Sequence, residues 1–333
     1  MSFLATIEVF LESGFVFSLI AMGYYVTYTI LDFPDLTVEG TFLSGAVTFG
    51  LLVSHGVNAW LALLASFAVG FIFGAVTGVL HVKLHIRPLL CGILVSTALI
   101  SVNLVAVGAG LNGDFSGDSI STISYGRDAA TLHNSFPMNL IPAKVGGIGV
   151  RDLVLFFVLA VVFKLLLDAF FKTKCGLLLR ASGDNDKFVS TLSVDSGNSK
   201  MLGIAIGNGY AAVSGALYSH ISGNVNQSMG IGMVVIGLAS LIIGISLFKK
   251  VRFMRPTTKV IVGAVIYQAC LTVAQKLGMP SAYNKLIMAV LFTLTLILSG
   301  KKKKAAASKE KDSAEHFVNK GAGERHGDRK CSN

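Results

Sequence analysis

Long apolar segments separated by short polar turns extend along the chain as far as residue 300. Several of them approach the ~20 residues that a helix needs to cross a bilayer. The pattern therefore predicts an all-α, polytopic integral membrane bundle of about nine spans. The predicted crossings are residues 14–31, 38–53, 60–80, 89–110, 153–171, 201–221, 231–248, 257–274 and 282–299. Residues 1–12 are amphipathic, so they are expected to lie at the membrane interface or to extend the first crossing.

The composition agrees with a membrane protein. Of the 333 residues, 53% are hydrophobic and only 14% are charged, and the mean hydropathy is +0.69. Soluble domains carry roughly a quarter charged residues. We therefore expect one transmembrane domain over residues 1–300 rather than two soluble domains. Residues 301–333 are basic and low in hydrophobicity, so they are expected to form a disordered cytoplasmic tail.

The positive charge predicts the orientation of the bundle rather than binding to nucleic acid. The formal net charge is +10, and Lys and Arg collect within residues 81–87, 172–200 and 249–255 and in the tail. The predicted crossings put all of these segments on one side, so the positive-inside rule predicts an external N-terminus and a cytoplasmic C-terminus. No Lys or Arg precedes Lys83, and no cleaved signal peptide is expected.

Two polar segments are candidate docking surfaces. Residues 172–200 combine clustered charge with apolar residues at helical spacing, which predicts a short amphipathic helix on the cytoplasmic side. An ordinary solvated loop is the alternative. Residues 111–150 form the longest loop outside the tail and fall on the external side.

A third polar segment, residues 32–40, interrupts two apolar runs with three carboxylates and a proline. Such a segment is costly in lipid, so it indicates a broken helix that enters the bundle. Polar groups in spans tend to face cavities, although packing between helices is the alternative for the tyrosines and asparagines. The candidates for a translocation path are Tyr24, Tyr28, Asp35, Thr37, Glu39, Asn103 and Asn208. Gly70, Gly74 and Gly78 repeat every four residues and are interpreted as helix packing.

The motifs of several enzyme classes are missing from the sequence. It contains no GxxxxGK[ST] phosphate loop, no HExxH and no GxSxG. The four cysteines lack metal-ligand spacing, and His81 and His85 lack a nearby third ligand. We therefore expect no catalytic residue, metal or cofactor in this chain.

Three stretches carry a resemblance to a known family: CGLLLRASGDND from Cys175, GNGYAAVSGALYSHISG from Gly207 and GIGMVVIGLASLIIG from Gly230. They resemble the permeases of bacterial ABC importers in the branched-chain amino acid and ribose class. DLTVEGTFLSGA, from Asp35, is similar to the broken-helix segment of that family. Together with IRPLLCGILVSTALISVNL, from Ile86, it looks like a subgroup described as tryptophan or tyrosine importers.

The resemblance implies that residues 172–200 contain a coupling helix, which would fit a groove on a separate ATPase that binds ATP and Mg²⁺. The residues that match its motif are Gly176, Leu179, Arg180, Ala181, Gly183 and Asn185. It also implies an external substrate-binding protein, a second copy of the chain and a place in the lipid of the bacterial cytoplasmic membrane.

The solute is expected to be an amino acid, aromatic if the subgroup applies. Residues 33–39 depart from the Gly-Gly-Ile-Asp-Leu-Ser-like segment of sugar-transporting relatives. Two alternatives stay open: a carrier or channel that works without ATP, and an intramembrane enzyme that uses Asp32 and Asp35.

Overall fold

The computed structural model describes residues 3–112, 122–124, 132, 150–184, 196–249, 251, 253–276, 283, 286–290 and 292–293. Its elements are α1 (Phe3–Tyr24), the π-helical segment η1 (Tyr25–Ile30), α2 (Thr37–Ser54), α3 (Ala59–Val82), α4 (Pro88–Asn112), β1 (Thr122–Ser124), α5 (Val150–Phe170), α6 (Lys174–Asp184), α8 (Gly197–Ser222), β2 (Asn224–Asn226), the 3₁₀ turn η4 (Gln227–Gly230), α9 (Met233–Leu247) and α10 (Pro256–Lys276). The predicted helical bundle is confirmed. The described residues also include an antiparallel pair of strands, β1 and β2, that the apolar pattern did not indicate.

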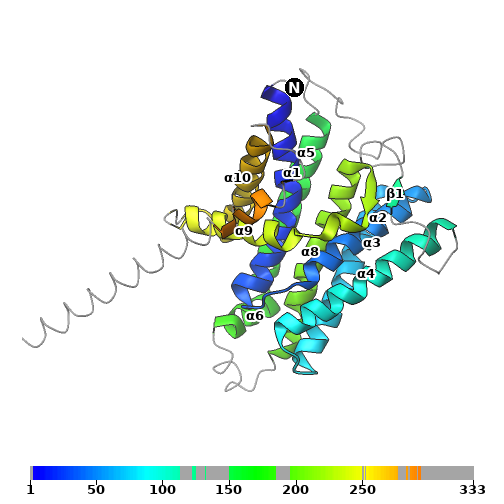
Figure 1. The fold of residues 1–333 in the computed structure, drawn as a ribbon. Helices are drawn as coiled ribbons and strands as arrows, with labels where there is room; N and C mark the ends of the chain where they lie inside the picture. Colours follow the sequence, from blue (N-terminus) through cyan, green and yellow to red (C-terminus); the bar gives the residue numbers. More distant parts are fainter. Residues whose placement is uncertain are drawn as a thin grey trace, which may run out of the picture.

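The helices form a membrane-spanning bundle (Figure 1). In the described part of the chain, 7 candidate spans are long and apolar enough to cross a membrane. The first runs over Thr6–Ile30, so the amphipathic N-terminal residues extend the first crossing. Every predicted crossing up to residue 274 falls on a helix. The last one, residues 282–299, lies for the most part outside the described residues, and the tail lies entirely outside them.

Helix α8 lies at the centre of the bundle and packs against α3, α2 and α1. Its position matches the sixth predicted crossing, yet it is not among the 7 apolar spans. Most of its residues are buried by other helices, including Asn208, Ser214 and several glycines. A helix that is enclosed by protein does not need lipid-facing apolar side chains, which explains its lower hydropathy.

The chain between α1 and α2 enters the bundle as a broken helix, as its carboxylates and proline predicted. The helix loosens into π turns at η1, and Asp32 then takes a left-handed backbone conformation with φ of 52°. The backbone is not helical again until Thr37. Phe33 and Asp35 are nonetheless buried. Buried irregular backbone needs polar partners inside the protein, and these partners define the first part of the candidate site.

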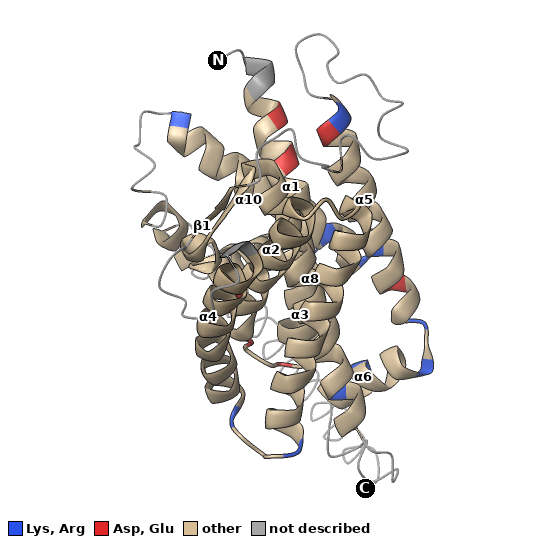
Figure 2. Ribbon diagram, turned by 90° about the vertical axis from the view of Figure 1, so that its right-hand side faces the viewer, with Lys and Arg blue, Asp and Glu red and all other residues tan. Residues whose placement is uncertain are grey.

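The two ends of the bundle differ in charge. The turn between α3 and α4, which contains Lys83 and Arg87, lies at the same end as α6 (Figure 2). The start of α1, with Glu8 and Glu12, lies at the opposite end. Two of the basic segments, the turn between α3 and α4 and the start of residues 172–200, therefore share one end.

Candidate functional site

Asp35 is the centre of a buried polar network in the broken segment. Its side chain is 1% exposed. One carboxylate oxygen, Oδ1, accepts a hydrogen bond from the backbone N–H of Thr37 at 2.8 Å. The other, Oδ2, accepts from Nδ2 of Asn208 at 2.6 Å. The carboxylate therefore caps the start of α2 and joins it to the central helix α8.

Asn208 extends this network across α8. Its Oδ1 accepts from Oγ1 of Thr41 at 2.9 Å, and its Nδ2 also donates to the carbonyl of Ile204 at 3.0 Å. On the other side of the segment, the hydroxyl of Tyr24 donates to the carbonyl of Asp35 at 3.0 Å. A buried network with this many partners holds one backbone arrangement firmly.

The network brings four of the predicted path residues together: Tyr24, Asp35, Thr37 and Asn208. Thr37 also lies 3.1 Å from the hydroxyl of Thr77 in α3. All four are buried among α1, α2, α3 and α8, and none of them lines the grooves described below. In this conformation their observed contacts hold the broken segment in place.

The other three predicted path residues lie apart from this network. Glu39 accepts a hydrogen bond from the N–H of Gly232 through Oε1 at 2.9 Å, beside the start of α9. Tyr28 is 37% exposed at the end of η1. Asn103 is buried in α4 and donates weakly to the carbonyl of Gly40, at 3.4 Å. The sequence could not separate these environments, because all are polar residues in apolar surroundings.

Two grooves on the bundle differ in chemistry. The larger, of about 460 Å³, lies among α3, α5 and α8 and is lined by aromatic and aliphatic side chains such as Trp60 and Phe163. The other, of about 360 Å³, lies among α2, α3 and α4 and includes Ser44, Thr48 and Asn103. A polar solute needs hydrogen-bonding groups, so the second groove is the better candidate for contact with it. Sequence reasoning missed Ser44 and Thr48, which are unremarkable in an apolar helix.

Gly70, Gly74 and Gly78 lie where α3 meets α8. A Cβ at Gly74 would lie 2.7 Å from Cβ of Asn208 and 2.8 Å from Cα of Ala205. A Cβ at Gly78 would lie 2.9 Å from Cα of Met201. Such distances leave no room for a side chain, so the glycines allow the two backbones to approach closely.

Helix α6 lies at the basic end of the bundle and is seated by its inner face. Leu179 is fully buried and lies against Gly203 of α8. A Cβ at Gly183 would lie 1.7 Å from the carbonyl oxygen of Ile30, and one at Gly176 would meet the backbone of Phe170. These three residues of the coupling motif therefore fix α6 against the bundle.

The outer face of α6 carries different residues. Lys174, Cys175, Leu177 and Ala181 are exposed, and Leu177 is 56% exposed. The Arg180 guanidinium lies over the ring of Phe171, 4.4 Å from its centroid, so it is held partly by the protein itself. Asn185 lies outside the described residues. The motif did not include Leu177, although its helical spacing relative to Lys174 and Ala181 would have placed it on this face.

Among the described residues, no group of three or more His, Cys, Asp or Glu side chains could hold a metal ion. Nδ1 of His81, in the last turn of α3, lies 2.9 Å from the carbonyl oxygen of Ile86, and Nδ1 of His85, in the following turn, lies 3.2 Å from that of Lys83.

A multi-pass helical bundle with a buried broken helix and a short amphipathic helix at its basic end has the architecture of a membrane transport protein. Comparison with known families then gives the assignment. Residues 6–296 match the model of the permease component of branched-chain amino acid transport systems, and the chain belongs to this family. It is therefore a transport permease and not an enzyme.

Similar proteins carry related names. The chain is 37% identical to the tyrosine transport system permease protein of Clostridioides difficile over 280 residues, which are 84% of this chain and 86% of that protein. It is 27% identical over 292 residues, 86% of this chain and 95% of the relative, to an uncharacterized protein of Rickettsia prowazekii. It is 25% identical over 243 residues, 72% of this chain and 74% of the relative, to the "probable branched-chain amino acid transport permease protein LivH" of Methanocaldococcus jannaschii. No solved structure matches the chain.

Proposed function

We propose that this chain is the permease subunit of an ATP-driven ABC importer for an amino acid. The observation that carries the proposal is the position of α6, which is seated on the bundle by Gly176, Leu179 and Gly183 and presents Leu177 outward. A short amphipathic helix that is packed by one face and free on the other can fit a groove of a partner protein. The docking partner is a separate cytoplasmic ATPase, which binds ATP and Mg²⁺.

The way α6 is held supports a mechanical role. Its inner face lies against η1 and the base of α8, through Gly183 and Gly203. Those same elements flank the broken segment that Asp35 holds. A displacement of α6 by the ATPase would therefore act directly on the packing around this segment, and a bistable arrangement there would change which side of the membrane is open.

The solute is an amino acid, and an aromatic one is favoured by the 37% identity to a tyrosine transport permease. Two copies of the chain line the path, with the polar groove of Ser44, Thr48 and Asn103 as the candidate contact surface in each. An external binding protein delivers the solute. In this proposal the N-terminus is outside and the C-terminus is inside a bacterial cytoplasmic membrane, as the basic end of the bundle indicates.

The test is purification in mild detergent, followed by measurement of ATP hydrolysis in the purified complex. The wild-type chain should retain a nucleotide-hydrolysing subunit. Leu177→Glu should weaken its retention by at least about tenfold, because a charge replaces an apolar docking residue. Leu84→Glu is the matched control, since Leu84 is 61% exposed on the turn between α3 and α4 at the same end of the bundle.

Each outcome has a distinct meaning. Solute uptake without any copurifying ATPase would favour a carrier that works without ATP. Equal retention of the ATPase by wild type and Leu177→Glu would move the docking surface away from the outer face of α6.

A further inference from the structure

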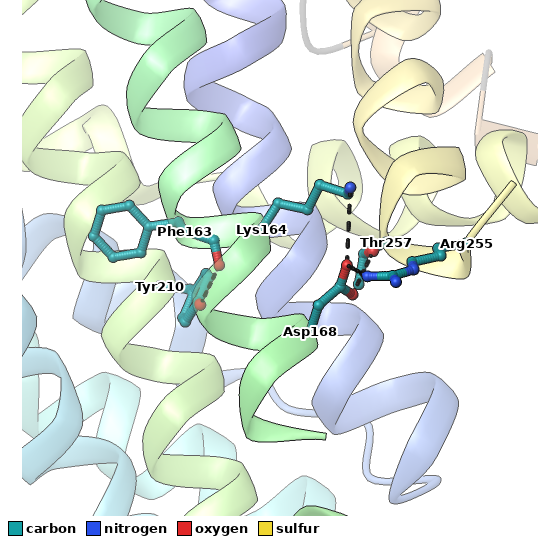
Figure 3. A network of polar contacts seen from close by, with 6 residues as sticks. All are labelled: Phe163, Lys164, Asp168, Tyr210, Arg255 and Thr257. Atoms are coloured by element: carbon teal, nitrogen blue, oxygen red, sulfur yellow. Dashed lines mark hydrogen bonds and ion pairs between the residues drawn. The ribbon is translucent and has the colours of Figure 1, made fainter. Parts of the chain in front are cut away.

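Asp168 is a charged residue near the end of α5 whose role the proposed docking does not explain. Its side chain is 11% exposed. Oδ2 accepts a hydrogen bond from Nη1 of Arg255 at 3.0 Å, and Oδ1 accepts from Oγ1 of Thr257 at 2.8 Å (Figure 3). Nζ of Lys164, one turn earlier in α5, lies 3.8 Å from Oδ2. We call Asp168, Arg255 and Thr257 the Asp168 clamp.

The clamp joins two helices that have little other contact. α10 packs chiefly on α1 and α9, and it meets α5 at few points. Close backbone approach at Gly244 and Gly263 binds α9 and α10 into one unit. A largely buried carboxylate with charged partners forms stronger hydrogen bonds than neutral groups do. The clamp therefore links the end of α5 directly to the start of α10.

The position of the clamp relates it to α6. Only residues 171–173 separate α5 from α6. On the opposite side of α5, the hydroxyl of Tyr210 in α8 donates to the carbonyl of Phe163 at 2.7 Å (Figure 3). The half of α5 that leads into α6 is thus tied to the central helix on one side and to α10 on the other.

We propose that Asp168 is a positioning residue for energy coupling, which passes the displacement of α6 to the pair of helices α9 and α10. This inference rests on the proposed function, because it needs an ATPase that moves α6. The clamp makes the end of α5 and the start of α10 move together. Without it, α6 could still bind the ATPase and hydrolysis could proceed, but α10 would no longer follow.

Asp168→Asn tests the proposal, because it keeps the shape of the side chain and an acceptor for Thr257 while it removes the charge that holds Arg255. In proteoliposomes with the ATPase, the variant should retain the subunit and its basal hydrolysis within about twofold. Solute uptake should fall by about tenfold or more, the size expected for loss of a hydrogen bond to a buried carboxylate. The number of ATP molecules hydrolysed per solute should rise in proportion.

Two further variants separate coupling from stability. Arg255→Gln removes the partner of Asp168 that is 58% exposed. Solute uptake should fall, as it should with Asp168→Asn. Uptake by the double variant with Asp168→Asn and Arg255→Gln should be no lower than uptake by Asp168→Asn alone, because both substitutions remove the same ion pair. Lys83→Gln is the control: it removes a charge at the same end of the bundle, outside the clamp, and should leave uptake unchanged.

A distance measurement gives a readout that a merely structural role would not move. Cys175 in α6 and Cys270 in α10 are both exposed and can carry spin labels after Cys91→Ser and Cys331→Ser. When nucleotide is trapped on the ATPase, the distance between the labels should stay the same in the parent protein. It should shift or broaden with Asp168→Asn.

The proposed coupling role of Asp168 would be contradicted if uptake by Asp168→Asn were within about twofold of wild type. It would also be contradicted if Asp168→Asn and Arg255→Gln lowered uptake independently of each other. Failure of the wild-type chain to retain any ATPase would instead overturn the proposed function. The two failures are therefore distinguishable in the same set of preparations.

Discussion

At the residue scale, Asp35 shows how a membrane protein holds irregular backbone inside the bundle. Asp35→Ala would leave the N–H of Thr37 without its acceptor and would remove the link to Asn208. A buried donor that loses its acceptor costs about 1–3 kcal/mol. We therefore expect a lower midpoint of thermal unfolding in detergent, measured by size-exclusion chromatography after heating.

Asp32→Asn is the matched control for this prediction. Asp32 is an exposed aspartate in the same segment, with φ of 52°, a conformation that asparagine adopts readily. The free energy of unfolding of the Asp32→Asn variant should differ from that of wild type by no more than about 0.5 kcal/mol. If both variants melted at the wild-type temperature, the network around Asp35 would not stabilise the broken segment.

At the scale of elements, the contact between α3 and α8 depends on the absence of side chains. In Gly74→Val the new atoms would meet Cα of Ala205 and the carbonyl oxygen of Ile204, at 2.8 and 2.9 Å from the Cβ position. Backbone atoms cannot rotate away, so we expect a loss of at least about 1–3 kcal/mol and a lower thermal midpoint. Ala68→Val, at an exposed position of α3, should behave like wild type. Equal melting of the two variants would contradict the close packing.

The elements also show what the sequence could and could not predict. Apolar length predicted the crossings, and even the less apolar α8 was found, because polar turns bound it on both sides. The pairing of β1 with β2 was missed, since three-residue strands have too short a pattern to detect. The burial of Ile123 and Val225 between that sheet and α2 is a tertiary contact that only the fold reveals.

At the scale of the whole molecule, the sequence predicted a short helix within residues 172–200 better than it predicted how that helix packs. The resemblance around Arg180 implied a coupling helix, but the motif alone did not indicate that Leu179 and Gly183 contact the bundle; helical spacing could have placed Leu177 on the outer face. Likewise, Asp35 and Asn208 are 173 positions apart, and nothing local indicates that they share a hydrogen bond. Contacts between residues so far apart in the sequence follow from the packing of the bundle and not from any segment alone.

The orientation of the molecule gives the last prediction. Cys175 is exposed on α6, at the basic end, whereas Asn224 is exposed on β2, beyond the end of α8 that lies away from α6. The positive-inside rule predicts that α6 lies in the cytoplasm. With Cys91, Cys270 and Cys331 replaced by serine, a membrane-impermeant maleimide should label Cys175 only in inside-out vesicles. With Cys175 also replaced, Asn224→Cys should be labelled in intact cells. The reverse labelling pattern would show that the bundle has the opposite orientation, with α6 out of reach of any cytoplasmic ATPase.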